Sequence, residues 1–373
     1  MISIINSLPN LNPAYNNFIV KFQSDTIDEP VRASVMVDGL EFVFFPFEGV
    51  FTMNLKDMAK ALFAPDRFKD SIIPDLSELF IYDDDSIVKS LVVDITVEAD
   101  FVSDFRAFTF NFYGGVEQQI GYRKKLAYAQ DTDVRILLPT ANYLTYTVPY
   151  FEGYPFDFSV YGTNSGDTIS FRNISTSMTS ESYAITNSDT KRMYLCDGGN
   201  EVTFDDVILL NSALNRLELY VNDEFKCNVN IFRKESECGH YLKWLNNEGA
   251  YSYWLFSSVA RETYKTKELD VIEGDYGNLQ DIYSSIYPIG KTATATLQLN
   301  TIADGQFADY FKSLSTSAQV ELYYYSSPFN QIEDESDFIK VYLNAGSMDT
   351  KTKNGKLSIS LSVDLPPINT ITL

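Results

Sequence analysis

Residues 241–256, YLKWLNNEGAYSYWLF, contain both tryptophans of the chain in two short runs that flank a polar turn. In each run, neighbouring side chains point to opposite faces if the backbone is extended, and NNEG at 246–249 supplies turn-forming residues. The stretch therefore predicts a β-hairpin. Cross-strand aromatic pairs stabilise hairpins by about 0.2–1 kcal/mol each, so packing alone explains the clustering. Stacking on a sugar is the alternative role for the aromatic residues Tyr241, Trp244, Tyr253 and Trp254.

The same alternating pattern continues through most of the 373-residue chain, in which 14% of residues are aromatic. Residues 31–51, VRASVMVDGLEFVFFPFEGVF, contain Asp38-Gly39, a dipeptide suited to a tight hairpin turn between two strands. Many short strands separated by turn residues are typical of sandwiches and barrels and exclude a parallel α/β fold. We therefore expect an all-β, multi-domain β-sandwich or barrel protein with one or two short helices.

Two segments have the periodicity of amphipathic helices. Near residues 54–63, Asn54 can cap LKDMAKALF, with Asp57 as the partner in a capping box. The second segment, DGQFADYFKSL at residues 304–314, places four apolar side chains on one face: Phe307, Tyr310, Phe311 and Leu314. Both helices are expected to pack on sheets.

The length of the chain suggests about two or three domains. Polar stretches that interrupt the strand pattern lie near residue 130 and at residues 233–240. These breaks predict an N-terminal β-sandwich domain with one helix, a middle β-rich domain and a C-terminal β-sandwich domain, over residues 1–130, 131–232 and 233–373.

The formal net charge of −22 disfavours specific nucleic-acid partners and anionic lipid, because the average surface repels phosphate groups. Three cysteines do not form the framework of a disulfide-rich secreted domain. The first residues lack the basic and apolar regions of a signal peptide, and no stretch approaches the roughly 20 apolar residues that span a bilayer. We expect synthesis in the cytoplasm and no membrane insertion.

Motifs for chemistry are weak. His240 is the sole imidazole, and Cys238, two residues away on the same predicted strand, would lie roughly 6–7 Å from it. Adding Cys227 gives a poor set of zinc ligands, and the acidic run at residues 83–85 does not match a calcium loop. We therefore expect no enzyme, no cofactor and no metal, although a pair of carboxylates for glycoside hydrolysis would depend on the fold alone.

Three stretches carry a resemblance to a known family. The pattern Tyr241-Leu-Lys-Trp244-Leu-Asn246, then Gly249, then Tyr253-Trp254-Leu-Phe256, is similar to a hairpin in tail structural proteins of tailed bacteriophages, particularly those infecting Bacteroidota. VDGLEFVFFPFEGVFTMNLKDMAKALF at 37–63 and FIKVYLNAGSMDTKTKNGKLSISLSVDLPPIN at 338–369 also resemble these proteins. The similarity is strongest at residues 31–63 and 231–373 and includes no catalytic residue.

The resemblance implies a distal-tail or baseplate-type protein of the virion tail. Such a subunit would form a homo-oligomeric ring and bind other phage tail proteins as an assembly and attachment scaffold. The alternative is a carbohydrate-binding, adhesive tail module that recognises host surface glycans. A polysaccharide-degrading enzyme is the less favoured third hypothesis.

Overall fold

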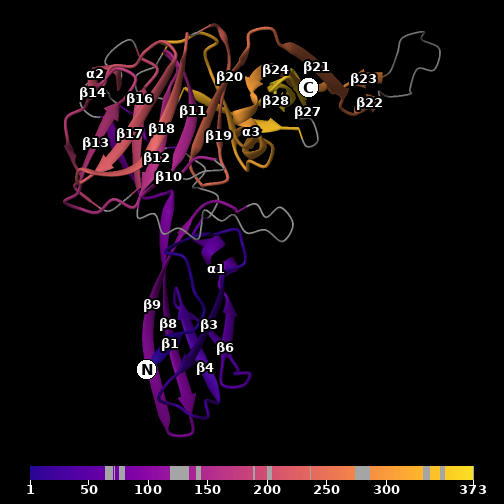
Figure 1. Cartoon of the computed structure of the whole chain (residues 1–373). Coiled ribbons are helices and arrows are strands. Elements are labelled where there is room, and N and C mark those ends of the chain that lie inside the picture. The colour runs from indigo at the N-terminus through magenta and orange to yellow at the C-terminus, as the bar shows by residue number, and fades with distance from the viewer. Residues whose placement is uncertain are drawn as a thin grey trace.

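The computed structural model describes residues 1–63, 70, 72–74, 80–117, 134–139, 144–187, 190–199, 204–235, 237–273, 286–330, 337–344 and 349–372. The all-β fold expected from the sequence is confirmed. A slender N-terminal domain lies below a larger body, hereafter the head, from which a hairpin projects sideways (Figure 1). No helix in the described part of the chain is long and apolar enough to cross a membrane.

The N-terminal domain is a sandwich of two sheets. The smaller sheet has the order β1-β3-β6, formed by Ile2–Ile4, Ile19–Ser24 and Phe51–Asn54. The larger has the order β2-β9-β8-β4-β5, formed by Leu11–Pro13, Val102–Tyr113, Val88–Ala99, Arg32–Val37 and Leu40–Phe44. Alternate side chains such as Val35, Val93 and Ile95 are fully buried between the sheets.

Local structure in this domain follows the sequence closely. Asp38 and Gly39 have φ angles of 49° and 77°, which is the left-handed turn that pairs Val37 with Leu40. The helix α1 spans Lys56–Ala61, but its N-cap is Leu55, so the predicted capping box was wrong. Asn54 ends β6, and its side-chain oxygen accepts hydrogen bonds from the backbone N–H groups of Phe18 and Lys56, both at 3.1 Å.

The head contains a second sandwich. One sheet has the order β10-β12-β16-β7, formed by Arg135–Ile136, Phe156–Tyr161, Thr190–Cys196 and Ile81–Asp84. The facing sheet has the order β11-β18-β17-β13-β14, formed by Thr145–Phe151, Glu224–Lys234, Leu214–Val221, Thr168–Asn173 and Met178–Thr179, with β15 (Tyr183–Ala184) beside β13. The single-turn helix α2, Phe204–Val207, contacts this sandwich. Because β7 pairs with β16, the chain enters the head before it returns to complete the N-terminal domain.

A third large sheet completes the head. Its order is β20-β19-β25-β26-β28-β24-β21, formed by Tyr251–Ser257, Gly239–Leu245, Val320–Tyr323, Phe338–Leu343, Lys356–Asp364, Lys291–Asp304 and Arg261–Glu268, and β27 (Asp349–Lys353) pairs with β28. The predicted helix near residues 304–314 is confirmed as α3, Ala308–Ser315. All four side chains of its predicted apolar face are buried.

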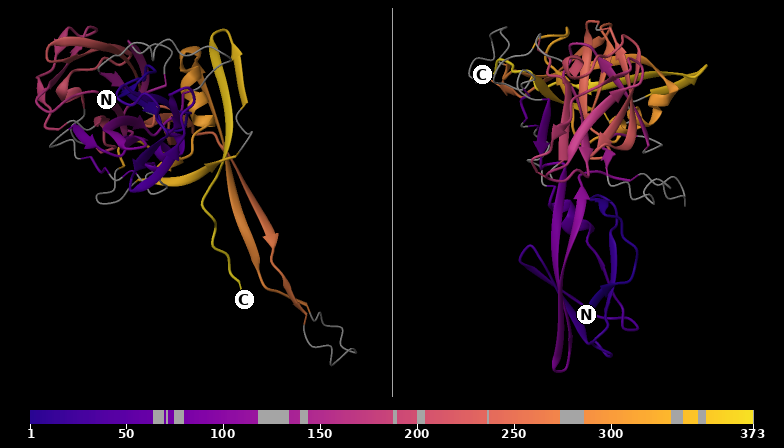
Figure 2. Two further views of the ribbon diagram at one scale, coloured as in Figure 1. Left: turned by 90° about the horizontal axis from the view of Figure 1, so that it is seen from below. Right: turned by 60° about the vertical axis from the view of Figure 1, so that its left-hand side comes forward.

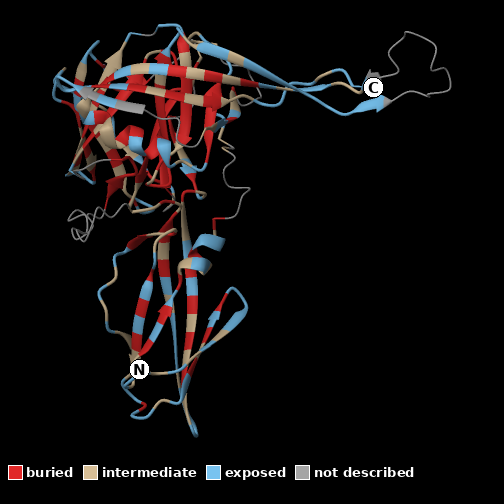
Figure 3. Cartoon of the chain, turned by 90° about the vertical axis from the view of Figure 1, so that its right-hand side faces the viewer, coloured by how far each residue is buried: buried red, intermediate tan, exposed pale blue. Residues whose placement is uncertain are grey.

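One hydrophobic core extends through the whole head, from Phe80 to Val363 (Figure 3). The boundary expected at residues 232 and 233 falls inside β18, and residues on both sides of it belong to this core. The boundary expected near residue 130 lies outside the described residues. The N-terminal domain has a separate core, which runs from Ile2 to Phe112.

A projecting hairpin leaves the head and is hereafter called the arm. It consists of β21, the outer half of β24, and the smaller pair β22 (Val271–Glu273) and β23 (Ile286–Pro288) (Figures 1 and 2). The C-terminal segment runs beside it through isolated bridges from Thr372 to Gly290 and from Ile368 to Ala293. Seven of the eight residues of β21 are exposed.

The two cores predict two thermal unfolding transitions by calorimetry. Phe22→Ala removes a buried ring from the N-terminal core. It should lower the free energy of unfolding of that domain alone, by about 3–5 kcal/mol. Leu219→Ala in β17 and Leu361→Ala in β28 should each lower the free energy of unfolding of the head by about 2–5 kcal/mol, and both should shift the same transition. If Leu219→Ala and Leu361→Ala shifted two different transitions, the result would contradict a single core in the head.

Candidate functional site

The hairpin at residues 241–256 forms as predicted, with Trp244 opposite Ser252 and Leu242 opposite Trp254. Its four aromatic candidates are inaccessible to a ligand, with exposed fractions of 0% for Tyr241 and Trp244, 2% for Tyr253 and 1% for Trp254. The indole N–H of Trp244 donates to the Ser313 hydroxyl of α3 at 2.9 Å. These rings therefore have the packing role, and the platform for a sugar that the sequence allowed is not present on the surface.

The turn of this hairpin lies where the N-terminal domain meets the head. The backbone N–H of Val116 donates to the Asn247 carbonyl at 2.8 Å. A Cβ atom at Gly115 would lie 2.2 Å from the same carbonyl oxygen, so only glycine allows this approach. Glu248 forms a buried ion pair with Arg135 of β10 at 3.3 Å. We call residues 246–249 with Gly115 and Val116 the joint.

Asn246 determines the shape of the joint from the inside. Its side-chain oxygen accepts hydrogen bonds from the backbone N–H groups of Glu248 at 2.8 Å and Ala250 at 3.3 Å. Its amide nitrogen donates to the Leu137 carbonyl at 3.2 Å and to the Ser252 hydroxyl at 3.0 Å. A buried amide with all these partners holds the turn in one conformation.

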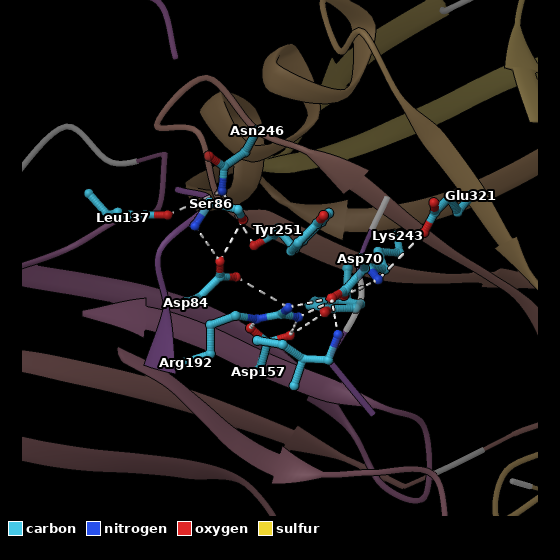
Figure 4. Close-up of polar contacts among 12 residues, drawn as sticks. Asp70, Asp84, Ser86, Leu137, Asp157, Arg192, Lys243, Asn246, Tyr251 and Glu321 are labelled. Atoms are coloured by element: carbon cyan, nitrogen blue, oxygen red, sulfur yellow. Dashed lines mark hydrogen bonds and ion pairs between the residues drawn. The ribbon is translucent and has the colours of Figure 1, made fainter. Parts of the chain in front are cut away.

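A cluster of buried charges lies next to the hairpin inside the head (Figure 4). We call it the charge cluster, and its members are Asp70, Asp84, Asp157, Arg192, Lys243 and Glu321. They come from the segment before β7 and from strands β7, β12, β16, β19 and β25. Sequence reasoning singled out only the run that contains Asp84.

Arg192 is at the centre of the charge cluster, and its side chain is 0% exposed. Its guanidinium donates two hydrogen bonds to Asp157, both at 2.9 Å, and two to Asp70, at 2.7 and 2.9 Å. The Asp84 carboxylate lies 3.6 Å from the same guanidinium. These four hydrogen bonds use four of the five N–H donors of the guanidinium, in the planar, paired geometry that suits carboxylates.

Lys243 extends the charge cluster into the hairpin. Its ammonium group binds Asp70 and lies 3.5 Å from Glu321 of β25. It also lies 4.4 Å from the centre of the Tyr251 ring, where the π electrons favour a cation. Lys243 therefore connects the segment that carries Asp70 to the third sheet of the head.

The protonation states in the charge cluster favour structure over acid–base chemistry. Burial alone would raise the pKa of Asp70, but Arg192 and Lys243 together outweigh it and hold this pKa well below its usual range. Attraction to Asp157 and Asp70 likewise overcomes burial and raises the pKa of Arg192. A general acid needs a pKa near the working pH, and these shifts move the two groups away from it.

The cysteines and the histidine considered for chemistry are not assembled into a site. Cys238 is exposed, whereas Cys227 is buried in β18, and burial raises the pKa of the Cys227 thiol to about 12. Burial also lowers the pKa of His240. Asp83 binds Lys191 and Asn187, and Asp84 belongs to the charge cluster. Within the ranges that the structure describes, no group of three or more His, Cys, Asp or Glu is placed to hold a metal ion.

Comparison with known proteins gives limited information. No protein-family model matches the sequence, and no curated protein matches it. Fibronectin(III)-like modules of Clostridium thermocellum CbhA align at 7% identity over 63% of this chain and 95% of theirs, with a TM-score of 0.20. The Plexin A4 extracellular region aligns at 8% identity over 97% of this chain and 36% of its own, with a TM-score of 0.23. The native form of E. coli alpha-2-macroglobulin aligns at 10% identity, covering 100% of this chain and 20% of its own, with a TM-score of 0.20.

Asp70→Asn tests the charge cluster. The substitution leaves Arg192 and Lys243 buried with one counter-charge fewer and should lower the free energy of unfolding by about 3–5 kcal/mol at pH 7. Because the folded protein lowers the pKa of Asp70, its contribution is complete well above the ordinary value of 3.8 and is lost as the pH falls below it. The difference between wild type and Asp70→Asn in chemical denaturation should therefore narrow below about pH 4.

Asp57→Asn is the matched control, since Asp57 is exposed on α1. It should change the free energy of unfolding by less than about 0.5 kcal/mol. A stability difference between wild type and Asp70→Asn that grows on acidification would contradict the direction of the pKa shift.

Proposed function

We propose that this chain is a structural subunit of a bacteriophage tail, which assembles with copies of itself into a ring and acts as a scaffold for neighbouring tail proteins. The arm is the observation that carries the proposal. It extends away from the head in Figure 1 and in the left view of Figure 2, and seven of the eight residues of its strand β21 are exposed. A monomeric protein gains nothing in stability from such an extension, whereas a neighbouring subunit can bind it.

Two physical arguments support a partner for the arm. Isolated two-stranded ribbons are marginally stable in water, so contacts with a neighbouring subunit would stabilise the outer part of the arm. In the described part of the chain β21 is also the last strand of its sheet, so one of its edges has no strand partner there. Closed symmetric assembly covers such edges on every subunit at once.

The far end of the N-terminal domain offers a second contact surface. Phe45, Phe47 and Phe101 have exposed fractions of 73%, 78% and 101%. Phe44 of β5 and Val97 of β8 both pair with Ala33 of β4. Phe45 is one residue further along, so it lies close to the turn between β8 and β9 that carries Phe101. Exposed aromatic groups gathered at one end of a domain are typical of protein contacts, which fits a subunit that touches more than one neighbour.

The other hypotheses receive less support from the site. A glycan-binding role through Trp244 and Trp254 requires exposed rings, and both are buried. Hydrolysis of a polysaccharide requires a carboxylic acid with a raised pKa, and Asp70, a carboxylate of the charge cluster, has a lowered one. A structural role uses the same buried residues to make the head rigid.

Light scattering on the purified chain, followed by negative-stain imaging of the main peak, tests the proposal. We expect one species whose mass is a fixed multiple of 42.3 kDa and whose images show a closed ring. Ring assembly should strengthen with protein concentration, because it depends on mass action. A chain that remains a monomer up to millimolar concentration would overturn the proposal.

A further inference from the structure

The two faces of the arm differ in charge. Successive residues of a strand point to opposite faces, so Arg261, Lys265 and Lys267 of β21 share one face, and Glu262 and Glu268 share the other. We call the first the basic face. Its residues are exposed, apart from the half-buried Thr263. The alternation of side chains along β21 therefore places its cations on one face and its anions on the other.

The neighbouring strand β24 extends the basic face without adding a charge. Residues directly opposite each other in an antiparallel pair lie on the same face. The partners of Arg261, Thr263, Lys265 and Lys267 are all uncharged: Gln298, Thr296, Thr294 and Thr292. At the base of the arm, Asp364 of β28 pairs with Thr296, and its carboxylate accepts hydrogen bonds from Thr296 and Asn344.

Ion pairing differs between the two faces of the arm. Among the residues that the structure describes, Arg261, Lys265 and Lys267 form no ion pair, while Lys291 on the other face lies 4.0 Å from Glu268. The arm points away from the head (Figure 3 and the left view of Figure 2), and the carboxylates of β21, Glu262 and Glu268, lie on its other face. These charges are available to a second molecule.

The charge of the whole chain indicates which molecule this is. The sequence has 51 acidic and 29 basic residues, so an uncharged-plus-basic face is complementary to the average surface of another copy. From this complementarity we infer that the basic face of the arm binds the acidic surface of a second copy of this chain. The inference rests on the proposed ring and specifies which surface of one subunit joins the next.

Such a contact is heterologous, because an arm on one copy meets a different surface on its neighbour. Repeated around an axis, heterologous contacts close into a ring when the rotation between copies divides a full turn. Electrostatic contacts also orient the approaching subunits before exposed apolar groups at the outer part of the arm, such as Ile272, come into contact. The basic face therefore determines register, and the apolar groups add affinity.

Charge reversal of the basic face tests this inference. The variant Arg261→Glu, Lys265→Glu, Lys267→Glu should raise the protein concentration needed for ring assembly by about tenfold or more, as measured by light scattering. The matched control is Lys56→Glu, Lys60→Glu, Lys312→Glu, which makes the same change in net charge on helices α1 and α3. The control should assemble nearly as wild type does.

Cross-linking identifies the acidic surface directly. Wild-type chains with natural and with ¹⁵N isotopes are mixed, assembled and treated with a carbodiimide, which joins a lysine to a carboxylate at zero length. We expect mixed-isotope links from Lys265 or Lys267 to Asp or Glu residues of the other copy. We also expect assembly to weaken in salt, because exposed charges are screened.

The outcomes separate this inference from the proposed function. One outcome is that the arm variant forms rings as well as wild type does and that wild-type rings give no mixed-isotope links to Lys265 or Lys267. This outcome would overturn the inference but not the proposed ring. A second outcome is that wild type and the control variant bind heparin, that the arm variant does not, and that assembly is unchanged. This outcome would assign the basic face to an anionic polymer and would also overturn the inference. A wild-type chain that never assembles would overturn both proposals.

Discussion

The structure depends on the burial of one positive charge, that of Arg192. A guanidinium without contact to water is costly to bury unless carboxylates surround it with good geometry. Asp157 provides two hydrogen bonds from the adjacent strand, and Asp70 provides two from the segment that leaves the N-terminal domain. The need to neutralise Arg192 therefore ties the first sheet of the head to a segment that would otherwise be only a connection.

The aromatic hairpin transmits this constraint to the rest of the head. On one face of the hairpin, Lys243 binds Asp70 and the Tyr253 hydroxyl donates to Asp157. On the other face, Trp244 and Trp254 pack on α3. Since both faces are buried, the hairpin has no surface left for a ligand, and its turn is free only to contact the N-terminal domain at the joint. The clustering of tryptophans thus results from a position between two layers.

Sequence reasoning succeeded where the determinants are local. Asp38-Gly39 specifies its own turn, and the spacing of Phe307, Tyr310, Phe311 and Leu314 specifies the buried face of α3. The sequence could not decide whether Tyr241 and Trp244 are buried. The alternation of side chains along a strand shows that the strand has two faces, but it does not show what covers each face. The turn at residues 246–249 was predicted, whereas its contact with Gly115 depends on the packing of two domains.

The charge cluster could not be predicted for a different reason. Asp70 and Arg192 are 122 positions apart, and Lys243 lies further still along the chain. With 51 acidic residues, nothing in the sequence distinguishes a carboxylate that will be buried beside Arg192 from one that will be solvated. The domain boundary expected at 232 and 233 falls inside β18, which pairs with β11 and β17 through contacts that no local pattern records.

The distribution of charge suggests how one assembly can be selected from many. In the charge cluster, carboxylates surround Arg192 and Lys243, so these two buried cations contribute rigidity and offer nothing to a partner. Outside, a chain with a net charge of −22 repels its own copies in most orientations. An exposed basic face on the arm lowers that repulsion in only one relative position of two subunits. Attraction in one register, combined with repulsion in the others, is a sufficient physical basis for specific association, and in the proposed ring the head and joint would repeat that register in each subunit.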